Sequence, residues 1–171
     1  MRKTNIQPWT KEWERTYEQE QRLLKEILKE ELVDIFHIGS TSVPAIGYAK
    51  PIIDILVVVK EIDKVDHYNE VLRKVGYEPK GDNGIAGRRY FPKGKQNRTH
   101  HVHIFQSGNE HIQTHLDFKM YLMEHPEDAK AYGELKLELA RQFPDNHNMY
   151  QEGKQDFVNE LVERARSWKA N

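Results

Sequence analysis

An apolar run interrupted by one acid, PIIDILVVV at residues 51–59, constrains the fold of this chain more than any other feature. Its middle is apolar at consecutive positions, which is typical of a central strand with both faces buried. Asp54 stands inside this run, and a carboxylate buried without a partner costs several kcal/mol. The sequence therefore predicts a covered sheet and a partner for Asp54. That partner is a metal ion, a cation, backbone amides, or Lys50 in an ion pair at the edge of the strand.

Hydrophobic periodicity predicts the other elements. Apolar positions from Trp13 to Leu32 have helical spacing behind a possible Thr10 cap, and a second helix is closed by Gly76. The glycine-rich segment 76–94 favours one or two hairpins. We expect helices over 10–32, 65–75, 109–124, 126–142 and 147–168, and strands over 33–38, 51–59 and 98–106. This order predicts an α+β (mixed α/β) fold in one domain over 1–171, with a mixed-sheet core at 1–108 and a helical C-terminal part at 109–171.

The charge balance limits the classes of partner. The 171 residues include 26 basic and 27 acidic side chains, which does not favour an extended nucleic-acid or anionic membrane surface. The absence of cysteine excludes disulfides and thiolate zinc sites. The N-terminus lacks the apolar run of a signal peptide, and the longest apolar stretch is far too short to span a bilayer. We expect a cytoplasmic protein, as a monomer or a small homo-oligomer.

A Gly-Ser turn precedes the apolar strand. Gly39 lets the backbone approach a ligand closely, and the amides and hydroxyls of Ser40, Thr41 and Ser42 can then face phosphate oxygens. No Gly-Lys-Ser/Thr closes the turn, so it is not a Walker loop. The competing interpretation is an ordinary polar loop. Lys50, just before the strand, is a further candidate phosphate ligand.

Histidines are concentrated in RTHHVHIF, residues 98–105. Strand alternation places His101 and His103 on one face, opposite His100 and Val102. Two imidazoles at this spacing can hold a metal ion together with a carboxylate on a neighbouring strand, or can act as acid–base groups or phosphate contacts. The alternative is a merely polar strand face.

Basic and aromatic side chains alternate in GRRYFPKGK, residues 87–95. Arg88, Arg89 and Lys93 are candidate phosphate ligands, since guanidinium groups bind phosphate in bidentate fashion and aromatic rings stack on bases. Alternation would separate Arg88 from Arg89 on the two faces of the strand. A solvated hairpin edge explains the same pattern.

Taken in order, HIGSTSVP, AKPIIDI, GRRYF and RTHHVHIF, followed by the long helical tail, resemble the GrpB family from about Trp9 to Ala165. That resemblance implies the nucleotidyltransferase-like fold. In that superfamily a Gly-Ser pair holds the triphosphate, and acids at i and i+2 on a strand hold two magnesium ions with a third acid. Ile38, Gly39 and Ser40 match the first part of this pattern, and Asp54 matches the first acid.

The second acid of the pattern is missing, because Leu56 stands two residues after Asp54. With His101 and His103 as the nearest substitutes, we expect one divalent ion of the zinc, manganese or iron type rather than a magnesium pair. The expected function is binding of a nucleotide or other phosphorylated small molecule, with metal-dependent phosphoryl or nucleotidyl transfer. The alternative is a non-catalytic module for a nucleotide or coenzyme A precursor. A partner surface on the helical tail is a third hypothesis, although packing of the tail on the sheet explains its apolar positions more simply.

Overall fold

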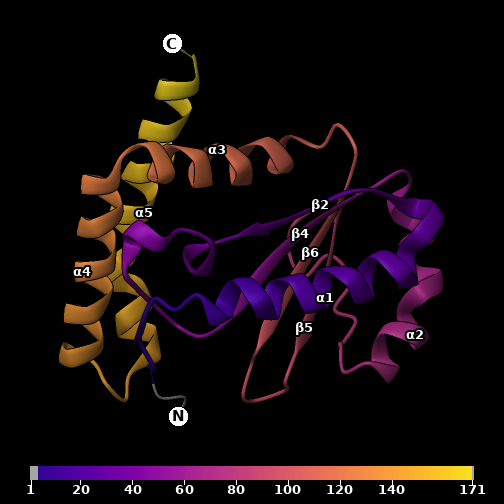
Figure 1. Cartoon of the computed structure of the whole chain (residues 1–171), viewed down its shortest axis with the longest axis horizontal. Coiled ribbons are helices and arrows are strands. Elements are labelled where there is room, and N and C mark those ends of the chain that lie inside the picture. Colours follow the sequence, from indigo (N-terminus) through magenta and orange to yellow (C-terminus); the bar gives the residue numbers. More distant parts are fainter. Residues whose placement is uncertain (1–3, 171) are drawn as a thin grey trace.

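A four-stranded mixed sheet forms the centre of the protein, in a computed structural model that describes residues 4–170. The strands are β2 (Leu32–Ile38), β4 (Ile53–Val59), β5 (Arg88–Lys93) and β6 (His100–Gln106), in the spatial order β2-β4-β6-β5 (Figure 1). Only β4 and β6 run parallel; the other pairs are antiparallel. A separate two-stranded ribbon joins β1 (Gln7–Pro8) to β3 (Tyr48–Ala49).

Helices cover both faces of the sheet. The helices α1 (Glu12–Leu28) and α2 (Asn69–Lys74) enclose the core formed by Ile53, Ile55 and Val57 on one face of β4. On the opposite face Leu56 packs with Ile38 and Phe105 beneath α3 (Glu110–Glu124). The central strand predicted from the apolar run is confirmed, because β4 is buried on both sides.

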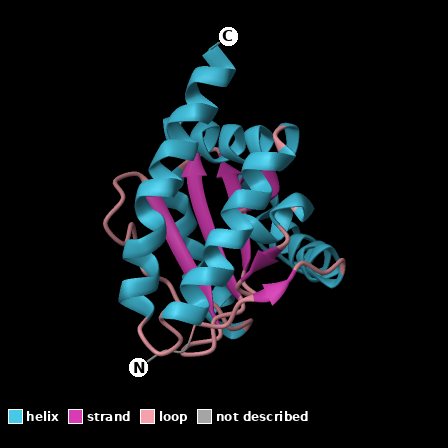
Figure 2. Cartoon of the chain, turned by 90° about the vertical axis from the view of Figure 1, so that its left-hand side faces the viewer, coloured by secondary structure: helices cyan, strands magenta, loops and turns pink. Residues whose placement is uncertain are grey.

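The helical tail stands beside the sheet. The helices α4 (Pro126–Gln142) and α5 (His147–Ala170) lie next to each other (Figure 1), and Figure 2 shows the last turns of α5 projecting beyond the other elements. Tyr132, Leu161 and Phe118 join Ile46 in a shared apolar cluster, so the tail packs on the protein itself. The predicted α+β fold is confirmed. No helix within residues 4–170 is both long and apolar enough to cross a membrane.

The structure corrects one predicted segment and confirms another. The segment 39–50 is not a plain loop: it contains the 3₁₀ helices η2 (Ser40–Ser42) and η3 (Pro44–Ile46), followed by β3. Segment 76–94 folds back on itself as predicted: Tyr77 forms an antiparallel bridge with Lys93, and the amides of Glu78 and Lys80 donate to the carbonyls of Pro92 and Tyr90. Gly81, Gly84 and Gly87, which have positive φ angles, lie in the connecting turn. Local propensity could not show that the partner of β5 is β6. The helices and strands otherwise have these bounds: η1 (Lys29–Glu31) follows α1, η4 (Ile62–Tyr68) precedes α2, and α5 extends to Ala170.

Gly133 allows α4 to lie unusually close to η3. A Cβ atom built on Gly133 would fall 1.7 Å from the carbonyl oxygen of Ile46, so no larger residue fits without moving backbone. Glycine in the middle of a helix costs roughly 1 kcal/mol relative to alanine. The close packing of α4 on the loop after β2 offsets this loss of helix stability.

Replacing Gly133 with alanine will therefore destabilise the protein, by roughly 1–3 kcal/mol as for other overpacked sites. The measurement is the free energy of unfolding in urea. Gly153→Ala in α5 is the matched control, since its Cβ would meet only the flexible end of Leu139. We expect that variant to stay within about 1 kcal/mol of wild type. Equal stability of the two variants would contradict the role of Gly133.

His37 is a buried imidazole on the edge strand β2. Its ring stacks on Tyr17 with centroids 4.7 Å apart, and its Nε2 atom lies 2.9 Å from Thr41 Oγ1. Burial lowers its pKa from 6.5 to about 4, assisted by the nearby ammonium of Lys119. Folded His37 thus stays neutral at pH values where the unfolded side chain is protonated.

Stability will therefore fall as the pH drops from 6.5 to 4, because the unfolded chain binds more protons in that window. Each additional proton bound on unfolding contributes about 1.4 kcal/mol per pH unit. Urea unfolding at several pH values measures this slope. A His37→Gln variant should show a smaller slope by up to one proton. Identical slopes for the two proteins would show that His37 is not the responsible group.

Candidate functional site

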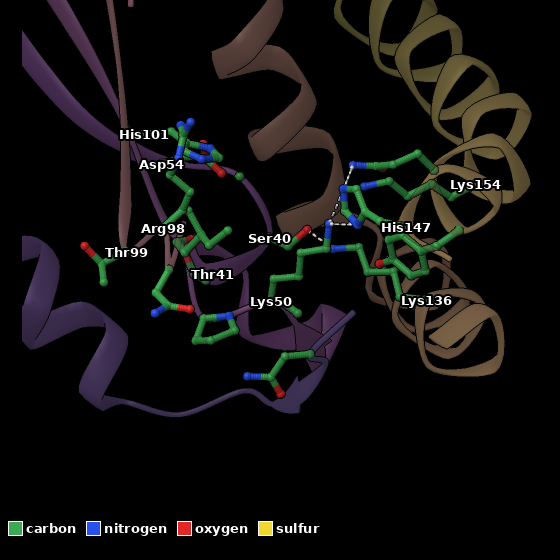
Figure 3. A pocket seen from close by; sticks show the side chains of 18 of the residues that line it. Ser40, Thr41, Lys50, Asp54, Arg98, Thr99, His101, Lys136, His147 and Lys154 are labelled. Carbon is green, nitrogen blue, oxygen red and sulfur yellow. Dashed lines mark hydrogen bonds and ion pairs between the residues drawn. The ribbon is translucent and has the colours of Figure 1, made fainter. Parts of the chain in front are cut away.

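A pocket of about 690 Å³ opens between the sheet and the helical tail (Figure 3). Its size is within the range of small-molecule sites in proteins. Its walls come from the Gly-Ser loop, the start of β4 and β6, and the facing sides of α4 and α5. Among the lining residues are Gly39, Ser40, Thr41, Lys50, Asp54, Arg98, Thr99, His101, Tyr132, Lys136, His147, Tyr150 and Lys154.

One side of the pocket is formed by Asp54, which contacts two imidazoles. Because β4 and β6 are parallel neighbours, Asp54 pairs in register with His101 and points to the same face as His103. Asp54 Oδ1 lies 3.4 Å from His101 Nδ1 and 3.3 Å from His103 Nε2. Burial opposes ionisation of this acid, but hydrogen bonds from the imidazoles hold its pKa well below its usual range. Asp54 is therefore a carboxylate that orients two histidines.

The two histidines have different surroundings. His101 lines the pocket, whereas His103 is turned toward the guanidinium of Arg88, whose Nη1 lies 3.4 Å from His103 Nδ1. The Tyr90 ring lies beside both imidazoles. A ligand in the pocket would consequently contact His101, whereas His103 interacts with Asp54 from outside the pocket.

Gly39 brings the loop directly against Asp54. Its φ angle is +75°, and a Cβ atom at this position would lie 2.6 Å from Asp54 Oδ2. The glycine is thus required both by the backbone conformation and by the space that the carboxylate occupies. Ser40, the next residue, consequently enters the pocket beside the acid.

The opposite side of the pocket is formed by lysines. Lys136, on α4, is 4% exposed; its Nζ donates a hydrogen bond to Ser40 Oγ and lies 4.3 Å from the centroid of the Tyr132 ring. Burial lowers the pKa of Lys136 well below its usual value, and the neighbouring charges of Lys154 and Lys50 add to this effect. A buried amine is thus held directly at the Gly-Ser loop.

Two further lysines adjoin it. Lys50 Nζ lies 3.3 Å from His147 Nδ1 and 4.9 Å from the Tyr150 ring centroid, and Lys154 Nζ lies 5.4 Å from the same ring. Burial also lowers the pKa of Lys154. Figure 3 shows these side chains converging from separate segments. We refer to Lys50, Lys136 and Lys154 as the lysine cluster.

The Gly-Ser loop itself contributes three of its four predicted residues. Gly39, Ser40 and Thr41 line the pocket, and Thr41 Oγ1 is held by His37 and by the carbonyl of Ile52. The Ser42 hydroxyl instead donates to the carbonyl of Gly39 at 2.6 Å and borders a smaller hollow between α1 and α3. Its predicted phosphate contact is therefore not in the main pocket.

The three basic residues predicted on β5 also lie outside this pocket. Arg88 and Arg89 lie on opposite faces, as alternation predicts: Arg88 is turned toward His103, and Arg89 Nε lies 2.8 Å from Asp66 Oδ1. Lys93 is likewise turned away, with Nζ 2.8 Å from Glu20 Oε1. The acids that attract these side chains come from distant segments, so the sequence of the strand could not reveal the pairing.

Sequence reasoning missed the residues from the helical tail. Lys136 and Lys154 occur in amphipathic helices, where a lysine is ordinarily a solvent-facing residue. The tyrosines beside them, Tyr132 and Tyr150, are spaced like core residues. Only the packing of α4 and α5 on the loop reveals that these four side chains, together with Arg98 and His147, line one pocket.

The lining of the pocket does not fit a bound magnesium ion. Within residues 4–170 no group of three or more His, Cys, Asp or Glu side chains is arranged to hold a metal ion. Asp54 is the only acid among the lining residues of the pocket, all of which belong to the described part of the chain. Leu56, at the position of the second superfamily acid, is 0% exposed and belongs to the core. The residues present do not match the oxygen-rich coordination that magnesium requires.

Known structures include a chain of similar fold. The Cid1 poly(U) polymerase in its MgATP-bound H336N form aligns with a TM-score of 0.55 at 15% identity, over 81% of this chain and 46% of the polymerase chain. At this identity the likeness concerns the fold alone. The nucleotidyltransferase-like architecture implied by the motifs is thereby supported.

Closer similarity is found among GrpB proteins. A crystal structure of conserved protein GrpB from Enterococcus faecalis aligns with a TM-score of 0.93 and 43% identity, covering 98% of this chain and 100% of the other. Glutamate-rich protein GrpB of Alkalihalophilus pseudofirmus is 34% identical over 155 residues, which are 88% of each protein.

The UPF0157 protein YqkA of Bacillus subtilis is 46% identical over 168 residues, or 98% of this chain; the chain spans about half of that relative, 49% of its length. The family model described as GrpB protein matches residues 3–164. On this match and these relatives, the chain belongs to the GrpB family.

Proposed function

We propose that the pocket binds a nucleotide or other phosphorylated small molecule, with the lysine cluster and Ser40 holding the phosphate. The buried Lys136 carries this proposal. No carboxylate within the described residues forms a salt bridge with it, and burial of an ammonium without a counter-charge is unfavourable. A phosphate in the pocket would supply that counter-charge.

The surroundings of Lys136 support an anionic ligand. Lys50, Lys154 and Arg98 line the same pocket, against the single acid Asp54. Ser40 offers a hydroxyl at the loop that the superfamily resemblance associates with phosphate. Ammonium and guanidinium groups form short, charge-assisted hydrogen bonds to phosphate oxygens, which are about twice as strong as neutral ones.

A second function, phosphoryl or nucleotidyl transfer to a hydroxyl acceptor, is favoured by the Asp54–His101 pair. The two side chains interact at 3.4 Å in the same pocket as the lysine cluster. A carboxylate that fixes an imidazole in one orientation is a recurrent arrangement for general acid–base catalysis. In this reaction His101 would take the proton of the acceptor hydroxyl, and Asp54 would position it. A non-catalytic module retains only the binding function.

Lys136→Met tests the binding site. It removes an unpaired buried charge, so the melting temperature of the ligand-free protein should stay equal or rise. The rise in melting temperature on adding nucleotides or coenzyme A precursors should disappear in this variant. Thermal-shift screening measures both effects.

The control is Lys130→Met on the same helix, where the lysine side chain is 75% exposed. It should keep the full ligand response of wild type. If Lys136→Met also keeps it, the lysine cluster does not bind the ligand.

His101→Gln tests the transfer reaction. We expect a loss of turnover of about 10²-fold or more with ligand affinity changed only a few-fold, because general acid–base groups contribute factors of this size. Product formation is followed by mass spectrometry, and affinity by calorimetry. Wild-type binding without any product would identify the non-catalytic alternative.

A further inference from the structure

We infer that the lysine cluster replaces bound metal ions in neutralising the ligand, so that the protein binds a metal-free phosphate anion and Mg²⁺ competes with it. This inference rests on the proposed function, since it specifies the form of the ligand that the same pocket takes. It separates this protein from sites in which magnesium bridges phosphate and carboxylates.

The oxygen donors of the pocket are the first reason. Magnesium selects oxygen ligands, and Asp54 is the single acid among the lining residues. Its Oδ1 atom already interacts with both His101 and His103. The next inward position on the same face of β4 is filled by the core residue Leu56, which leaves no place there for another carboxylate.

The arrangement of the cations is the second reason. Lys50 lies before β4, Lys136 on α4 and Lys154 on α5, and their side chains nevertheless converge at the Ser40 end of the pocket. Like charges brought together in this way repel one another, and their repulsion is relieved by an anion. A phosphate that arrives with Mg²⁺ carries less negative charge and adds a cation to an already basic pocket.

The contacts of the ammonium groups are the third reason. Lys136 lies over the ring of Tyr132 and Lys154 over the ring of Tyr150, with nitrogen-to-centroid distances of 4.3 and 5.4 Å. Ring faces attract the positive charge without accepting all its hydrogen-bond donors, as carboxylates would. These rings therefore position the ammonium groups and leave donors for phosphate oxygens.

Calorimetric titration with inorganic tripolyphosphate tests the inference, because this probe carries the charge without a nucleoside. Binding should be measurable in EDTA. Excess Mg²⁺ should weaken the apparent affinity at least tenfold, in proportion to the fraction of probe that remains metal-free. Binding that requires Mg²⁺, or is strengthened by it, would overturn the inference while leaving the proposed function intact. No binding under either condition would overturn both.

The variant Asp54→Asn distinguishes metal-free from metal-mediated phosphate binding. A site that binds phosphate through metal ions loses affinity when its carboxylate is removed. Here the substitution removes a negative charge beside the anion, so tripolyphosphate affinity in EDTA should stay equal or rise a few-fold, with a circular-dichroism spectrum like that of wild type. Lys154→Met should lower it about tenfold, whereas Arg89→Met, whose side chain pairs with Asp66 outside the pocket, should leave it unchanged. If folded Asp54→Asn instead lost affinity tenfold in the presence of Mg²⁺ and not in EDTA, Asp54 would hold a metal ion and the inference would be overturned.

Discussion

The close approach of Gly133 on α4 to the carbonyl of Ile46 is the contact on which the pocket depends, because it brings the helical tail against the loop after β2. Lys136, one turn later on the same helix, donates a hydrogen bond to Ser40 of that loop. The same close approach removes the ammonium of Lys136 from water. Packing and electrostatics are thus linked: the contact that docks the tail also buries the side chain of Lys136.

The two faces of β4 have different roles. Ile53 and Ile55 on one face of β4 belong to the main core, while Asp54 on the other face reaches the pocket and Leu56 returns to packing. This alternation places a single carboxylate opposite several cations. A nucleotidyltransferase-like fold can therefore carry a pocket lined mainly by positive charges, in place of an acid-lined metal centre.

Local patterns predicted what depends on local physics. The alternation of residues on β6 correctly placed His101 and His103 on one face, and the apolar run correctly marked β4 as central. The family resemblance supplied the fold. Patterns failed where a distant segment decides: Arg89 and Lys93 are drawn away by acids on other elements, and Lys136 looks like an ordinary surface lysine until α4 is packed. The sequence shows which side chains are present, but tertiary structure determines which of them are in contact.

The separation of Ser40 from Lys136 by 96 positions also has a consequence for how the protein folds. Contacts between distant parts of a chain require a large loop to close, and such contacts tend to be slow to form. The sheet and its motifs can assemble from residues that precede the tail, whereas the cationic wall exists only after α4 and α5 have docked. Binding competence is therefore expected to be a late event in folding, acquired when the two ends of this long loop meet.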